Sequence, residues 1–103
     1  MTESTYVSYR RVSFRKVANL RIRPVDEMGV CIVFTPDNPR LYTLNASAWL
    51  IMELCDGRNW RSLERRYFAT IEPSRSREVA RLELRRGIED LIQQGLIELV
   101  EPA

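Results

Sequence analysis

The stretch from Arg40 to Gly57 constrains the fold most, because a strand pattern passes there directly into a helix pattern. Residues 41–44 are strand formers whose apolar and polar side chains nearly alternate. Asn45 follows at once, and an asparagine at this position accepts a hydrogen bond from a free amide of the first helical turn. Apolar side chains then recur at helical spacing until Asp56-Gly57, which is a stop signal. The sequence therefore predicts a strand and a helix joined without a loop.

Two strand patterns precede this block, and two helix patterns follow it. Residues 20–25 alternate apolar and basic side chains, and residues 30–35 form a β-branched and aromatic run with turn residues on both sides. Helices are expected over residues 46–55 and about 60–69, and from a cap at Ser74 or Ser76 to about Gln94, followed by a short strand over 96–100. The predicted fold class is α+β, with a three-stranded antiparallel sheet followed by three helices.

The N-terminal segment differs from the rest of the chain in its charge and in its lack of periodicity. Six basic residues and no acid lie between Arg10 and Arg23. We predict a flexible basic arm over residues 1–18, which is a candidate docking element for an acidic partner, and one domain over residues 19–100. The apolar residues of this segment leave open the alternative that it pairs as a strand or docks locally. They are Tyr6, Val7, Tyr9, Val12, Phe14 and Val17.

Composition excludes several classes of protein. The chain of 103 residues carries a net charge of +2, which by itself implies no nucleic-acid partner. It has no histidine, and Cys31 and Cys55 form no metal-binding motif, so we expect no metal, no cofactor and two buried free thiols. The longest apolar run, residues 28–34, is too short to cross a membrane, and no secretory signal is visible. A cytoplasmic protein is expected.

The block over residues 41–57 resembles the PqqD family. Its pattern is L-Y-x-L-N-x-x-A-x-x-[IL]-[WM]-E-L-x-D-G. The strand at Val30–Phe34 and the sequence Ile88-x-x-Leu91-x-x-x-Gly95-Leu96-Ile97 also match the family, in the same order, so the resemblance covers about residues 19–99. It implies a winged helix-turn-helix variant known as the peptide recognition element of ribosomally made, modified peptides.

The resemblance also implies a function and a site. Family members are non-catalytic chaperones that bind the leader of a precursor peptide as an added strand and present it to a modifying enzyme, such as a radical SAM protein or a peptidase. Pyrroloquinoline quinone (PQQ) biosynthesis is one compatible pathway. We expect a monomer or weak dimer and no membrane partner. The peptide-binding residues implied on the third strand and third helix are Arg40, Leu41, Tyr42, Thr43, Leu44, Arg81, Arg85, Ile88 and Ile92.

Each of these residues also has an ordinary structural interpretation. Tyr42, Leu44 and Ile88 suit a core as well as a binding surface. Arg81 and Arg85 also suit a solvated, ion-paired helix face, because acidic residues lie at helical spacing from them.

A DNA-binding regulator and an enzyme are two further functional classes. The alternative is a DNA-binding winged-helix regulator, supported by the helix-turn-helix spacing of the second and third helices and by six arginines: Arg58, Arg61, Arg65, Arg66, Arg75 and Arg77. Against it, the strands come first here, and the third helix carries several acids that a phosphate-facing helix should avoid. An enzyme is not expected and no catalytic residue is assigned, because the chain has no histidine, no cysteine-based motif and no Gly-rich phosphate loop.

Overall fold

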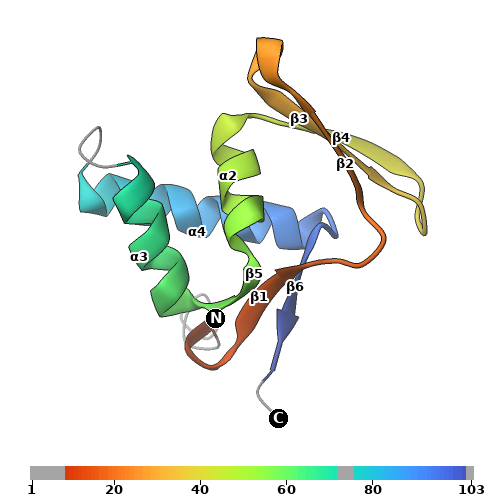
Figure 1. Cartoon of the computed structure of the whole chain (residues 1–103). Helices are drawn as coiled ribbons and strands as arrows, with labels where there is room; N and C mark the ends of the chain where they lie inside the picture. The colour runs from red at the N-terminus through yellow and green to blue at the C-terminus, as the bar shows by residue number, and fades with distance from the viewer. Residues whose placement is uncertain (1–8, 72–75, 102–103) are drawn as a thin grey trace.

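The computed structural model describes residues 9–71 and 76–101 (Figure 1). Two three-stranded antiparallel sheets flank a group of helices. In chain order the elements are η1 (Tyr9–Arg11), β1 (Ser13–Lys16), β2 (Arg21–Val25), η2 (Asp26–Met28), β3 (Val30–Thr35), β4 (Arg40–Leu44), α2 (Ala46–Leu54), β5 (Asp56–Asn59), α3 (Trp60–Ile71), α4 (Arg77–Gln93) and β6 (Ile97–Val100).

The first sheet is the meander β2–β3–β4, which confirms the predicted α+β fold with a three-stranded antiparallel sheet ahead of the helices. In β3, Cys31 and Val33 are fully buried, whereas the residues on either side of them are half-buried. Strand alternation therefore gives this sheet an inner face toward the helices and an outer face away from them.

The junction of β4 and α2 forms as predicted. The Asn45 side chain accepts a hydrogen bond from the Ala48 amide at 2.8 Å, which caps the helix. The helix ends at Leu54, and residues 56–59 then form β5, a strand that the sequence did not predict. The Asp-Gly-Arg-Asn sequence of β5 has little strand propensity of its own, so its conformation comes from pairing with β1.

The second sheet has the order β5–β1–β6 and corrects the assignment of residues 1–18 to a flexible arm. Over residues 9–16 that assignment is wrong, because β1 is the central strand of the sheet and Phe14 is completely buried. Tyr9 and Trp60 lie against the Phe14 ring, with ring centroids 5.3 and 5.9 Å away. The segment therefore follows the docking alternative wherever it is described, whereas Tyr6 and Val7 lie outside the described residues.

The longest helix, α4, packs an apolar stripe into the core. Ala80, Leu84, Ile88 and Leu91 are buried, and Ser76 is the cap, since its hydroxyl oxygen accepts a hydrogen bond from the Val79 amide at 3.2 Å. Helix α2 comes close to α4 at Gly87, where a Cβ atom would lie 2.5 Å from the Ile51 side chain. This close approach fixes the rotation of α4 about its own axis, because the side that carries Gly87 must face α2.

Candidate functional site

Strand β4 lies at one edge of its sheet. It pairs with β3 on one side, and no other described strand pairs with its second side. Alternate residues of an edge strand direct their amides and carbonyls away from the sheet, where an extended peptide can satisfy them. The start of β4 is fixed by Thr35, whose hydroxyl donates to the Asn38 carbonyl at 2.7 Å and accepts from the Arg40 amide at 3.1 Å. The edge is therefore held in a strand conformation before any partner arrives.

A hollow of about 630 Å³ separates β4 from the C-terminal end of α4. Its walls are Asn38, Arg40 and Tyr42 on one side, and Asp90, Gln93, Gln94 and Gly95 on the other. A smaller pocket of about 200 Å³ continues from it and shares several of these residues. We refer to the two together as the β4–α4 groove.

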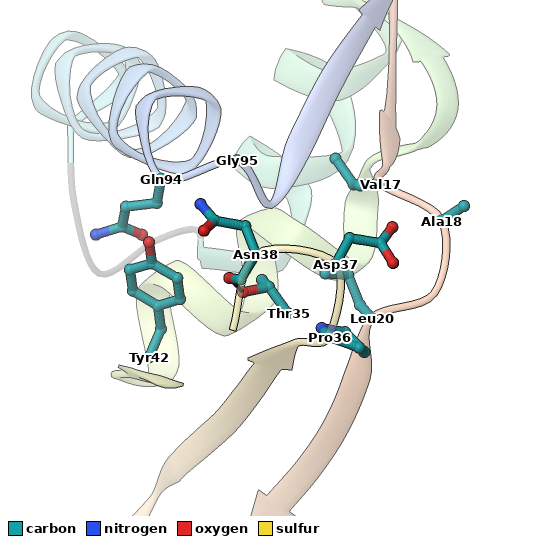
Figure 2. Close-up of a pocket in the computed structure, with 10 residues that line it drawn as sticks. All are labelled: Val17, Ala18, Leu20, Thr35, Pro36, Asp37, Asn38, Tyr42, Gln94 and Gly95. Atoms are coloured by element: carbon teal, nitrogen blue, oxygen red, sulfur yellow. Dashed lines mark hydrogen bonds between the residues drawn. The ribbon is translucent and has the colours of Figure 1, made fainter. Parts of the chain in front are cut away.

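The smaller pocket is more apolar than the hollow beside it (Figure 2). Val17 and Leu20 from the β1–β2 connection and Pro36 from the β3–β4 turn line it. Figure 2 shows the Tyr42 side chain reaching from β4 toward Gln94 at the end of α4. The groove thus offers polar contacts beside the strand edge and an apolar pocket at one end.

Gly95 shapes the end of α4 that lines this groove. Its φ of 78° is left-handed, and the Gly95 and Leu96 amides donate to the carbonyls of Ile92 and Leu91 at 3.0 and 2.9 Å. This is the usual glycine-dependent way of ending a helix. The chain turns away at that point, which leaves the last turn of α4 open toward β4.

The strand residues predicted for the site divide between the two faces of β4. Arg40 and Tyr42 line the groove, and Leu44 lies on the same face but is buried. Leu41 and Thr43 are exposed on the opposite, outer face. Side chains of β4 therefore contribute to the groove only at alternate positions, whereas its backbone edge runs along all five.

The structure does not bring the predicted helix residues to this groove. Ile88 is completely buried, and Ile92 packs partly buried against the core. The Arg81 Nε atom lies 3.0 Å from the Glu64 carboxylate on α3. Burial and the negative charge of Glu89 raise the pKa of the Tyr9 phenol, and the positive charge of Arg85 partly opposes them, so Arg85 acts on the N-terminal segment. The arginines therefore face α3 and the N-terminal segment, away from β4.

Sequence reasoning missed the α4 residues that do line the groove: Asp90, Gln93 and Gln94. They are polar residues on the surface of a helix, with no motif that marks them. Asp90 and Gln94 are spaced by one helical turn and border the buried stripe on the side opposite Arg81 and Arg85. On the sequence alone, either polar border of the buried stripe could line the groove. The packing of α2 and β4 against α4 places the border with Asp90 and Gln94 there.

The arginines of the DNA-binding alternative gather elsewhere. Three of them, Arg61, Arg65 and Arg77, line a second hollow between α3 and α4, together with Arg81 and Phe68. The guanidinium groups of Arg77 and Arg81 lie 5.4 and 5.6 Å from the centroid of the Phe68 ring. Arg75 is outside the described residues. In the described chain, β6 follows α4 and pairs with β1, so no hairpin wing follows the helix that would read DNA.

The family model described as Coenzyme PQQ synthesis protein D (PqqD) matches residues 31–97, which is more than half of the chain. The chain belongs to the PqqD family. The matched part begins in β3 and ends at the start of β6, so it contains the β4 edge and all the α4 residues of the groove. No curated protein and no solved structure matches the chain. PqqD-family proteins are non-catalytic accessory proteins that bind precursor peptides.

Both cysteines of this PqqD-family protein are buried free thiols. The pKa of Cys55 is raised to about 12, mainly by burial; the positive charge of Lys16 lowers it and the negative charge of Asp56 raises it, both by less than burial does. The Cys55 thiol also donates to the Ile51 carbonyl at 3.3 Å. Burial likewise raises the pKa of Cys31. At neutral pH both thiols are therefore protonated and shielded, which suits a structural role rather than nucleophilic chemistry.

The raised pKa of Cys55 predicts a loss of stability at high pH. Between pH 9 and about 12 the unfolded chain releases the Cys55 proton while the folded chain keeps it, so rising pH favours unfolding. The free energy of unfolding should fall by up to about 1.4 kcal/mol per pH unit from this group. Urea denaturation at pH 8 to 10.5 measures the slope. A Cys55→Ala variant should show a shallower slope, and equal slopes would contradict the assignment.

No described helix is long and apolar enough to span a membrane. Within residues 9–71 and 76–101, His, Cys, Asp and Glu side chains also form no cluster of three or more that could hold a metal ion.

Proposed function

We propose that this PqqD-family protein binds the leader of a ribosomally made precursor peptide as an added strand on β4. It then presents the peptide to a modifying enzyme, a radical SAM protein or a peptidase, in the cytoplasm where the peptide is made. The observation that carries the proposal is the open side of β4, which faces the β4–α4 groove. An added strand gains main-chain hydrogen bonds from the edge and specificity from pockets for its alternate side chains.

The groove lining indicates what kind of leader fits. Side chains of the added strand that point inward meet the Arg40 guanidinium and the Asp90 carboxylate near the carboxamides of Gln93 and Gln94. One further inward side chain reaches the apolar pocket beside Leu20. A leader segment with an acidic and an aliphatic residue two positions apart matches this order, because alternate residues of a strand share a face. The protein supplies no chemistry in this proposal; it raises the effective concentration of the peptide at the enzyme.

Chemical-shift mapping tests the proposal. The ¹⁵N-labelled protein is titrated with the synthetic leader of a ribosomally made precursor peptide that has an acidic and an aliphatic residue two positions apart. Amide shifts should concentrate in residues 40–44 and 90–95, and the Arg81 and Arg85 amides should change little. Shifts confined to residues 58–77 would contradict the proposal and favour the arginine surface of the DNA-binding alternative.

A pair of arginine variants sharpens the same titration. Arg40→Ala removes a charge from the groove and should weaken leader binding by up to about fivefold, the range for a solvent-exposed ion pair. Arg66→Ala is the matched control, since Arg66 is an exposed arginine of α3 outside the groove. Equal affinities for both variants and the unchanged protein would remove Arg40 from the site.

A further inference from the structure

The outer face of the β2–β3–β4 sheet carries apolar side chains that take no part in the core. Strand pairing places Phe34 between Arg21 and Leu41, and Ile32 between Arg23 and Thr43. Residues directly opposite one another in an antiparallel sheet project on the same face. Two rows of three side chains therefore cross this face, each with an arginine on β2 and an apolar residue at the centre. We call these six residues, Arg21, Arg23, Ile32, Phe34, Leu41 and Thr43, the outer sheet face.

This face is open to solvent within the described part of the chain. Leu41 is 67 % exposed, and Phe34 and Ile32 are half-buried without belonging to the buried core or to the residues packed against it. Figure 1 shows α2 and α4 on the other side of the sheet and no described helix on this one. Neighbouring exposed apolar residues framed by charges mark interaction surfaces in soluble domains.

The charges decide which partner fits. Arg21 and Arg23 are exposed, and neither forms an ion pair with a described residue. A second copy of this chain packed face to face would bring four arginines together with no acid from either outer sheet face. An apolar patch rimmed by carboxylates is complementary instead, because arginine binds carboxylates in a bidentate fashion. We infer that the outer sheet face is the docking surface for an acid-rimmed apolar patch on the modifying enzyme.

The position of this surface suits delivery of a peptide, and in this respect the inference rests on the proposed function. Leu41 belongs to β4, so a leader added to β4 would lie directly beside the outer sheet face. Its outward side chains would continue the same face as a fourth strand. An enzyme docked there would meet the adaptor and the leader together, and the modified part of the precursor would remain tethered close to it.

Affinity measurements with matched variants test the inference. The probe is a purified radical SAM protein that modifies the precursor of the leader used above, titrated by calorimetry with the full-length protein. Arg21→Glu combined with Arg23→Glu should weaken enzyme binding at least about tenfold through repulsion of the acidic rim. The control is Arg65→Glu combined with Arg66→Glu, two exposed arginines of α3. Leu41→Ser should also weaken binding, whereas Leu82→Ser, a leucine of α4 that is 64 % exposed, should not.

Each outcome decides the matter. Undiminished enzyme affinity in the β2 arginine variant overturns the inference, as does an equal loss in the α3 control or no binding by the unchanged protein. A dimer in sedimentation that Leu41→Ser dissociates would also overturn it, since the occupant would then be a second copy. Leader affinity is measured on the same samples. If the leader fails to bind but the β2 arginine variant still loses enzyme affinity, only the proposed function fails. If the leader binds but the β2 arginine variant keeps its enzyme affinity, only this inference fails.

Discussion

Replacing Phe14 by alanine is expected to lower the free energy of unfolding by about 3–5 kcal/mol. Phe14 is fully buried in the central strand of the β5–β1–β6 sheet, where its ring contacts those of Tyr9 and Trp60. Truncation removes the burial of the ring, its edge-to-face contact with Tyr9, and the support that joins the N-terminal segment to α3. A domain of this size has about 5–15 kcal/mol of total stability, so the variant should be close to unfolding.

Urea denaturation followed by circular dichroism measures this loss, and Phe34 supplies the matched control. Phe34 has the same side chain but lies half-buried on the outer sheet face, away from the core. Phe34→Ala should therefore cost no more than about 1.5 kcal/mol. Equal losses for the two variants would contradict the burial of the N-terminal segment. For the same reason, deletion of residues 1–16 should unfold the protein rather than remove a separate docking arm.

Two leader peptides methylated on alternate backbone nitrogens are expected to bind with very different affinities. In an added strand, the amides of every second residue point to β4, and the amides between them point to solvent. Methylation of three β4-facing amides removes three hydrogen bonds of about 1 kcal/mol each, a loss of at least about 100-fold in affinity. Methylation of the solvent-facing amides removes none of them and should cost no more than a few-fold.

Calorimetry on the unmodified protein compares the two peptides, so no variant of the protein can misfold in this test. The unmethylated leader is the reference, and a leader of the same composition in scrambled order reports non-specific binding. A similar loss of affinity for both methylated peptides would contradict strand addition. It would indicate a helical leader, whose binding is weakened by methylation of either set of amides. Similar retention of affinity would show that side chains alone bind the leader.

The sequence by itself determined the elements whose signals are local. β3, β4 and α2 could be predicted because side-chain alternation, the Asn45 cap and apolar spacing act within a few residues of the chain. The buried stripe of α4 followed from the same periodicity. The edge position of β4 also follows from local order, since β4 is the last strand of a meander and leads directly into a helix.

Only the tertiary structure decided the pairings between distant segments. β1 and β5 have weak strand patterns of their own, and they become strands because they pair with each other. β1 also pairs with β6, and its Phe14 side chain is fully buried. The rotation of α4 was likewise invisible in the sequence. Its two polar borders are equivalent on an isolated helix, and the approach of α2 at Gly87 turns Asp90 and Gln94 toward β4 and Arg81 toward α3. Apolar periodicity shows which face of a helix is buried. Which neighbouring element lies beside each polar edge of that face depends on the tertiary packing.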